Sequence, residues 1–311
     1  MKIVFFGTPA FAAPFLEALL TERDFDIIAT VTQPDKPAGR GNQLHACPVK
    51  MLAEQKSIPV LQPKTLKSTE AVDLLKPLEA DLFVVVAYGK IIPKAILDLP
   101  KQGCINVHPS LLPKYRGPSP MQWAIAEGDD QTGVCVMKLD EGMDTGPILA
   151  CETITINDNE TYETLVDKVH AIGPRLLVET IKRLDAITPI VQDDGKATIT
   201  RLLDREDGRI DWKAPMDVVE RKFRAYRPWP GSWSIWKRGS EELRLKILDV
   251  AFADFNADVP PGTVTIKNNR LFVDCADGTL EILRLQPEGK AEMDAANFLR
   301  GYSDVSAAVL A

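Results

Sequence analysis

The stretch "DLFVVVAYG", residues 81–89, is almost continuously apolar. A strand with one face in water alternates polar and apolar residues, whereas a strand buried on both faces of a parallel sheet does not. The run is also short and ends at a glycine, which is typical of a strand followed by a turn. It therefore predicts an inner strand of a mainly parallel sheet.

Similar apolar runs recur through residues 1–184, and helix-like stretches separate them. The other strand candidates are 2–6, 26–32, 58–61, 104–108, 133–139 and 150–156. Helical patterns fall at about 10–20, 48–56, 68–76 and 118–127. This alternation is typical of a doubly wound α/β domain. A longer helical stretch at about 161–184 closes it, and we expect Gly173-Pro174 to bend or break that helix.

The pattern changes after residue 184. Residues 185–206 carry no sustained periodicity and contain proline, glycine and charges, which predicts a linker between domains. Residues 207–311 read as short strands split by turns, for example "LRLKILDV" and "RLFVDCADG". Strands at such short spacing predict a small β-barrel as a second domain.

The overall composition excludes some classes of protein. A net charge of −7 argues against a wholly basic nucleic-acid binder, although it allows a local basic face. The five cysteines are dispersed without metal-ligand spacing, so we expect reduced thiols in a cytoplasmic protein and no metal site. No apolar run approaches about 18 residues, so no membrane span is expected.

The stretch "INVHPSLLPKYRGPSP", residues 105–120, carries the first chemical signal. Asn106 and His108 end the predicted strand 104–108 and lie two residues apart, so both side chains point to one side. In parallel sheets, ligands bind at the carboxyl ends of strands. An amide donor beside a group that exchanges protons near neutral pH can stabilise an oxyanion.

A second loop, "DEGMDTGPIL" at residues 140–149, follows the predicted strand 133–139 and holds three carboxylates. A carboxylate brought to His108 would orient its imidazole; the alternative is a solvated acidic turn. The loop "SLLPKYRG", residues 110–117, is either a stiff apolar wall for a flat ring or simply a buried loop. Since G-x-G-x-x-G, phosphate-binding and metal motifs are missing, we predict acyl transfer or hydrolysis rather than dinucleotide redox chemistry.

These motifs resemble those of the formyltransferases that use 10-formyltetrahydrofolate. The resemblance rests first on "NVHPSLLP" followed by "MDTG". It extends, in the family's order and nearly end to end, through "FFGTPAFA", "TQPDKPAGRG", "VVAYGKIIP", "RAYRPWPGSW" and "LQPEGKAEMDAANFLRG". The wider match is to the branch of the family that acts on methionyl-tRNA.

The resemblance implies a Rossmann-like N-terminal domain over 1–184, a linker over 185–206 and a C-terminal OB-like barrel over 207–311. It implies transfer of a formyl group from 10-formyltetrahydrofolate to the α-amino group of methionyl initiator tRNA, for translation initiation. No metal is needed for this reaction, and we expect a cytoplasmic monomer. An N-formyltransferase for a small amine, such as an amino-sugar nucleotide, is the alternative.

The resemblance also assigns residues to the expected site. It gives Asn106, His108 and Asp144 the catalytic role, while leaving open whether His108 or a water held by Asp144 takes the proton. The residues it implies for folate binding are Ser110, Leu111, Leu112, Pro113, Val86, Tyr88 and Gly89. With Pro109, the motif "HPSLLP" matches that of the smaller glycinamide ribonucleotide formyltransferases, so that branch of the family stays an alternative.

Two basic segments are the candidates for tRNA contact. Residues 221–238, "RKFRAYRPWPGSWSIWKR", contain six Lys or Arg and no acid, with aromatic residues interleaved. Basic residues follow phosphates and exposed aromatics stack on bases, although the tryptophans can instead be barrel core. The second segment is the loop 33–43, "QPDKPAGRGNQ". The expected tRNA-binding residues are Lys36, Arg40, Arg221, Lys222, Arg224, Arg227, Lys237 and Arg238.

One further alternative is an RNA-binding module that has the fold without the activity. The presence of Asn106, His108 and Asp144 argues against it. In the predicted linker, Ile199 and Leu202 stand where the family would have a tyrosine and a lysine. The linker therefore gives no support of its own to tRNA contact.

Overall fold

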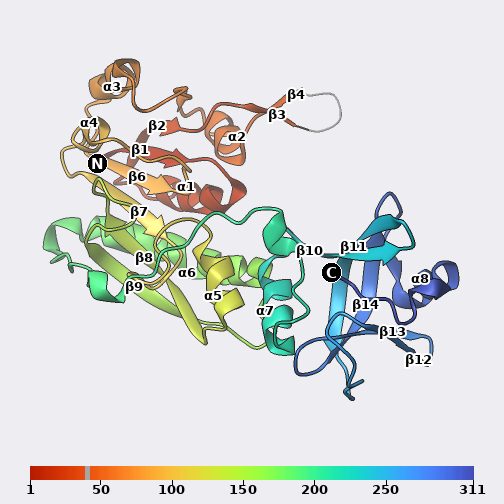
Figure 1. Cartoon of the computed structure of the whole chain (residues 1–311). Helices are drawn as coiled ribbons and strands as arrows, with labels where there is room; N and C mark the ends of the chain where they lie inside the picture. The colour runs from red at the N-terminus through yellow and green to blue at the C-terminus, as the bar shows by residue number, and fades with distance from the viewer. Residues whose placement is uncertain (39–42) are drawn as a thin grey trace. The chain divides into compact units, whose positions relative to one another are not determined.

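The computed structural model describes residues 1–38 and 43–311 (Figure 1). The chain divides into two compact units. Unit 1 comprises Met1–Pro120, Gln131–Thr155 and Leu165–Thr200, and unit 2 comprises Met121–Asp130, Ile156–Thr164 and Arg201–Ala311. Each unit has its own sheet.

The sheet of unit 1 has seven strands in the order β5-β2-β1-β6-β7-β8-β9. They are β1 (Lys2–Gly7), β2 (Asp26–Val31), β5 (Val60–Leu61), β6 (Leu82–Val86), β7 (Cys104–His108), β8 (Gln131–Lys138) and β9 (Ile148–Thr155). The first five in that order pair in parallel, whereas β8 and β9 are antiparallel. The prediction of a mostly parallel sheet is thus confirmed. The strand order runs outward from β1 in both directions, to β2 on one side and to β6 on the other.

Both faces of the inner strands are buried, as their unbroken apolar sequence requires. All five residues of β6 are buried. On one face, Phe6 and Phe83 pack 5.1 Å apart between ring centroids, in a core that also takes Leu75 of α3 (Thr69–Leu75) and Ile96 of α4 (Lys94–Leu97). Burial of such side chains is the main driving force of the fold.

Two helices of unit 1 pack closely enough to need a glycine. These are α1 (Ala13–Leu20) and α6 (Tyr162–Lys182), of which Leu165 onward belongs to unit 1. A Cβ added to Gly173 of α6 would lie 2.8 Å from the Phe15 ring. The α6 helix runs unbroken across Pro174, so, of the predicted bend or break, the break is wrong. The buried residues of α6 on both sides of Pro174 compensate for the lost hydrogen bond.

The loop predicted over 33–43 contains structure that the sequence pattern did not indicate. Two short strands, β3 (Lys36–Ala38) and β4 (Gln43–His45), pair as an antiparallel hairpin, and α2 (Pro48–Gln55) follows. Arg40 lies outside the described residues. The hairpin is too short to show a period of two, which explains why the sequence reads as a loop.

Unit 2 is built on an antiparallel sheet in the order β10-β11-β14-β13-β12, and β15 adds to β14. The strands are β10 (Ser232–Arg238), β11 (Glu241–Phe252), β12 (Val264–Lys267), β13 (Arg270–Asp274), β14 (Thr279–Pro287) and β15 (Met293–Asp294). The sheet curls, as Figure 1 shows. Its core contains Trp236 and Phe298, which meet edge to face. This confirms the predicted small β-barrel-like fold after the α/β part.

The remaining helices complete the chain. They are α5 (Pro120–Glu127), α7 (Met216–Ala225) and α8 (Ala295–Gly301). Within the residues that the structure describes, no helix combines the length and the apolar character needed to cross a bilayer.

The stretch between the two parts is irregular but bonded to unit 1. It contains short 3-10 turns at Leu184–Ala186 and Asp194–Lys196. Isolated β-bridges join Ile190 to Ile148 and Ile199 to Arg116. Residues up to Thr200 therefore belong to the first compact unit. The division into a domain over 1–184, a linker over 185–206 and a domain over 207–311 stays a prediction.

A pair of isoleucines tests the core of unit 1. Ile96 is fully buried, whereas Ile91, five residues earlier, is 71% exposed. We expect Ile96→Ala to lower the free energy of unfolding by about 2–5 kcal/mol, because it removes buried methyl groups and leaves a cavity. Ile91→Ala, the matched control, should stay within about 0.5 kcal/mol. Urea denaturation measures both, and equal effects would contradict this description of the core.

Candidate active site

Asn106 and His108 lie near the carboxyl end of β7, the edge at which parallel sheets bind ligands. Asn106 is opposite Val85 of β6, and His108 is opposite Cys135 of β8. Asn106 is half-buried, whereas His108 is buried. The parallel partner β6 ends at Val86, so the turn that follows it reaches the same edge.

Two neighbours hold the His108 ring. Its Nε2 lies 2.8 Å from the carbonyl oxygen of Tyr115, and its Nδ1 lies 3.5 Å from Oδ2 of Asp144. A carbonyl oxygen only accepts hydrogen bonds, so Nε2 carries the proton in this orientation. Nδ1 then faces the carboxylate, and a proton placed there would complete a charge-assisted contact. The imidazole is thereby held in one orientation.

Asp144 itself is held in an uncommon backbone conformation, with φ of +55°. Its Oδ2 accepts a hydrogen bond of 2.8 Å from the backbone N–H of Gly117. Two residues later, Gly146 admits no side chain, since an added Cβ would lie 1.9 Å from the carbonyl oxygen of Lys138. The carboxylate is only partly exposed, unlike that of Glu141 in the same loop. This loop is more than a solvated acidic turn.

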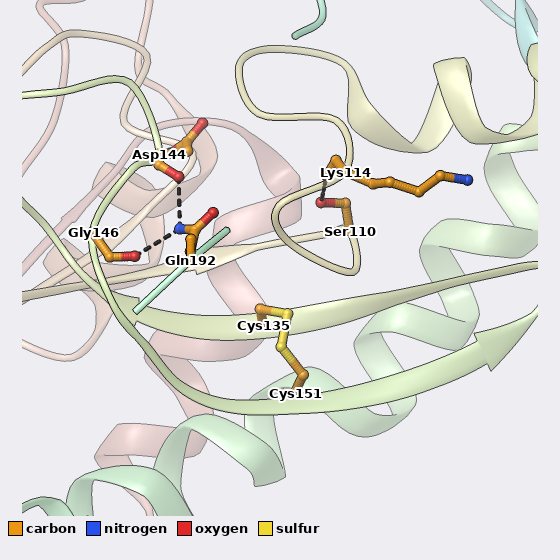
Figure 2. The surroundings of a disulfide bond; sticks show 7 residues. All are labelled: Ser110, Lys114, Cys135, Asp144, Gly146, Cys151 and Gln192. Carbon is orange, nitrogen blue, oxygen red and sulfur yellow. Dashed lines mark hydrogen bonds between the residues drawn. A yellow bond between two sulfur atoms is a disulfide. The ribbon is translucent and has the colours of Figure 1, made fainter. Parts of the chain in front are cut away.

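A third segment, residues 190–200, binds both of these loops, which the sequence did not reveal. Gln192 donates from Nε2 to the carbonyl oxygens of Asp144 (2.9 Å) and Gly146 (2.6 Å), as Figure 2 shows. Thr198 and Thr200 bind the other loop: the Tyr115 N–H donates to Thr198 Oγ1, and Thr200 Oγ1 donates to the Arg116 carbonyl. A run of polar side chains in an irregular segment was the available signal.

The predicted folate-binding run 110–113 forms a compact loop beside the sheet. Ser110 Oγ donates to the backbone carbonyl oxygen of Lys114 at 2.6 Å (Figure 2). Leu112 is buried against Cys135 and Met137 of β8, and Leu111 and Pro113 are half-buried. The loop is therefore anchored by its own side chains, and both alternatives from the sequence, an apolar wall and a buried loop, describe part of it.

The other predicted folate residues are placed differently. The side chains of Val86 and Tyr88 are buried in the core, and burial raises the pKa of Tyr88 to about 12. The Tyr88 hydroxyl has no hydrogen-bond partner among the described residues. Tyr88 and Gly89 nevertheless line a cavity of about 340 Å³, together with Lys36 and with Thr8 of the first turn. The run 110–113 does not line that cavity.

Four of the cations predicted to bind tRNA are near acids of their own domain. Arg221 pairs with Asp217, Arg224 with Glu220, Arg238 with Asp304, and Lys237 lies 3.8 Å from Glu242. Such pairing reduces the positive charge available to phosphate.

The remaining predicted cations are more available. Lys36, Lys222 and Arg227 are exposed and make no ion pair with any residue that the structure describes. Trp229 is 55% exposed, whereas the other aromatics of this segment, Phe223, Tyr226, Trp233 and Trp236, are buried. The alternative of a barrel-core tryptophan therefore holds for Trp236. Trp233 is buried outside that core, beneath Arg209 and Arg244, and of the three tryptophans only Trp229 is exposed.

The prediction of five reduced thiols is wrong for two cysteines. Cys135 and Cys151 are directly opposite in the register of β8 and β9, with 4.1 Å between their Cα atoms, and they form a disulfide (Figure 2). Cys47, Cys104 and Cys275 are free thiols. A separation of 16 residues gives no hint of this pairing, because it depends on the register of two strands. Among residues 1–38 and 43–311, no group of His, Cys, Asp and Glu could hold a metal ion.

Comparison with known protein families identifies the class to which this mostly parallel α/β unit belongs. The Formyl transferase family matches residues 1–181, and its C-terminal domain family matches residues 202–303. The chain therefore belongs to the formyl transferase family. The family matches leave residues 182–201 outside both ranges, which is where Gln192 and its neighbours lie.

Relatives that match nearly the whole chain indicate which branch of the family it resembles. The methionyl-tRNA formyltransferase of Caldanaerobacter subterraneus subsp. tengcongensis is 42% identical over 97% of this chain and 97% of its own. That of Acidobacterium capsulatum is 45% identical over 97% of this chain and 96% of its own. Within the family, the chain is thus similar to the methionyl-tRNA formyltransferases.

Solved structures show the same fold at lower identity. An N-formyltransferase of Helicobacter canadensis, in complex with folinic acid and dTDP-3-aminofucose, is 18% identical with a TM-score of 0.66. The match covers 91% of this chain and 98% of that one. HypX of Aquifex aeolicus in complex with tetrahydrofolic acid is 17% identical with a TM-score of 0.61, covering 96% of this chain and 47% of HypX.

The disulfide gives a direct chemical test. We expect the unfolded protein, without reductant, to react with a thiol reagent at three cysteines, and after reduction at five. Loss of the bond in a Cys135→Ala/Cys151→Ala variant should lower the free energy of unfolding by about 3 kcal/mol, the value for a closed loop of this length. Five reactive thiols before reduction would refute the pairing.

Proposed function

We propose that Asn106, His108 and Asp144 carry out the reaction of the methionyl-tRNA formyltransferases in this chain. The formyl group of 10-formyltetrahydrofolate is transferred to the α-amino group of methionyl initiator tRNA, for translation initiation. The observation that carries the assignment is the orientation of His108, whose two ring nitrogens face the Tyr115 carbonyl and the Asp144 carboxylate.

The chemistry follows from these groups. A neutral amine attacks the formyl carbon, a new C–N bond forms, and the carbonyl oxygen becomes an oxyanion. The amide of Asn106 donates to that oxygen, and His108 becomes a second donor when its Nε2–H turns from the Tyr115 carbonyl towards the oxyanion. The pair of His108 and Asp144, directly or through an ordered water, takes the amine proton and returns it to the leaving nitrogen of the folate as the old C–N bond breaks.

For the folate donor, we propose contacts from two strand-end segments. One is the run Ser110, Leu111, Leu112 and Pro113, whose anchoring to β8 gives it a fixed shape. The other is the turn after β6, with Val86, Tyr88 and Gly89. Because the first two side chains are buried, their contribution to folate binding is through backbone groups and the shape of the turn. Fixed backbone donors and acceptors are suited to the flat, polar edge of a pterin.

For the tRNA, we propose contacts from Lys36 and Arg40 and from the basic segment 221–238. Lys222 and Arg227 carry the largest share in that segment, since its other cations lie within ion-pair distance of an acid. The protein is expected to work as a monomer in the cytoplasm, where charged initiator tRNA is found. An amino-sugar nucleotide as formyl acceptor is disfavoured, because the identity to the methionyl-tRNA enzymes is more than twice that to the sugar enzyme.

The proposed catalytic residues can be tested with charged initiator tRNA as formyl acceptor. We expect Asn106→Ala, His108→Ala and Asp144→Ala each to lower kcat by about 100-fold or more, as the loss of an oxyanion donor does. Glu141→Ala, an exposed carboxylate in the same loop as Asp144, is the matched control and should keep normal turnover. Elongator methionyl-tRNA and an amino-sugar nucleotide serve as comparison acceptors. Normal turnover by His108→Ala would refute the assignment of the catalytic residues. Faster formyl transfer to the amino-sugar nucleotide than to initiator tRNA would refute the proposed substrate.

The proposed tRNA contacts predict a change in salt dependence. Each phosphate contact contributes close to one unit to the slope of log K against log salt. The double variant Lys222→Ala/Arg227→Ala should therefore weaken tRNA binding and flatten the slope by about 1.5–2 units. Lys290→Ala, which removes an exposed lysine outside this segment, is the control. Binding assays over a salt series measure this, and an unchanged slope would exclude phosphate contact at both residues.

A further inference from the structure

The side chain of Gln192 links three parts of unit 1 although it lies in an irregular segment. It is 8% exposed, and all of its polar atoms have protein partners. Its Nε2 donates to the carbonyl oxygens of Asp144 and Gly146, at 2.9 and 2.6 Å. Its Oε1 accepts from Nε of Arg116 at 3.0 Å. One amide thus connects the loop of Asp144 to the loop that follows β7.

Arg116 determines which end of this amide faces the Asp144 loop. A guanidinium only donates hydrogen bonds, and backbone carbonyl oxygens only accept them. Oxygen towards Arg116 and nitrogen towards the two carbonyls is therefore the one orientation of the Gln192 amide that satisfies all three partners. Arg116 is itself 5% exposed, and its Nη2 pairs with Oδ1 of Asp194 at 2.8 Å. The orienting group is thus fixed from two sides.

These bonds hold Asp144 at two points. Gln192 binds its backbone carbonyl, and the N–H of Gly117, the residue after Arg116, binds its carboxylate at 2.8 Å. Both anchors lead to the same short stretch, 116–117. The left-handed backbone at Asp144, with φ of +55°, is uncommon for a non-glycine residue, and contacts with its surroundings stabilise it. The surroundings here are Gln192 and Gly117.

We infer that Gln192 is a positioning residue for the formyl transfer reaction, and that Arg116 orients it. By fixing the backbone at Asp144, the amide sets the 3.5 Å approach of Asp144 Oδ2 to His108 Nδ1. The inference rests on the proposed role of Asp144. Small errors in such an approach are costly, because a displacement of about 1 Å can reduce a rate by about 100-fold.

The first test is Gln192→Glu, which has nearly the same shape and keeps an acceptor for Arg116 but loses both N–H donors. We expect kcat to fall on the order of 10- to 100-fold, with the KM for the folate donor little changed. Arg116→Lys, which removes the fixed Nε donor but keeps a positive charge beside Asp194, should change kcat in the same direction. Gln286→Ala is the matched control, because the Gln286 amide also donates to a backbone carbonyl, that of Lys290 in unit 2.

The decisive measurement combines Gln192→Glu with Asp144→Asn. If Gln192 acts through the Asp144 carboxylate, Gln192→Glu will cause little further loss of kcat in the Asp144→Asn background. If it merely supports the fold, the two losses will multiply, and the inference is overturned.

The single variants separate this inference from the proposed function. Normal kcat in Gln192→Glu, with Asp144→Asn impaired, also overturns the inference and leaves the proposed function intact. Normal kcat in Asp144→Asn would instead refute the proposed function. Should Gln192→Glu fail to fold, the same cycle with Arg116→Lys decides.

Discussion

The parallel pairing of β1, β6 and β7 is the constraint on which the rest of unit 1 depends. Parallel strands bring all their carboxyl ends to one edge, and their burial on both faces fixes the register. A slip of one residue in β7 would move His108 to the opposite face of the sheet. The apolar run of β6 therefore does more than stabilise the core, because it determines on which side the imidazole lies.

The sequence predicted the parts of the molecule that regular patterns encode. Strand β6 was evident from its unbroken apolar run, and the shared face of Asn106 and His108 followed from their spacing. The helix α6 was found, but its continuity across Pro174 was not, since local propensity speaks against it and long-range packing decides it. The Cys135–Cys151 pair was missed for a related reason. It depends on the register of two antiparallel strands, which a single sequence does not show.

The basic segment 221–238 shows how charge counted along the chain differs from charge presented to a ligand. Six cations and no acid within the segment predict a strong positive surface. In the folded unit, Arg221 and Arg224 meet acids one helical turn before them, and Arg238 meets Asp304 from much later in the chain. The exposed pair of Arg238 and Asp304 adds little stability, but all three pairs compete with phosphate for the guanidinium groups. The effective cations are thus fewer than the sequence suggests.

The loops that follow the strands at the site raise a problem common to such sheets. Beyond the ends of β7 and β8, backbone groups leave the ladder and need other partners when they are buried. Residues 190–200 provide them, through Gln192 at the Asp144 loop and Thr198 and Thr200 at the loop after β7. This segment lies outside both family matches and shows no regular period, so its run of polar side chains was the one available signal of a role. Its side chains nevertheless bind backbone groups of both loops that form the proposed site. The geometry of the site therefore depends on the segment that looked most like a simple connection.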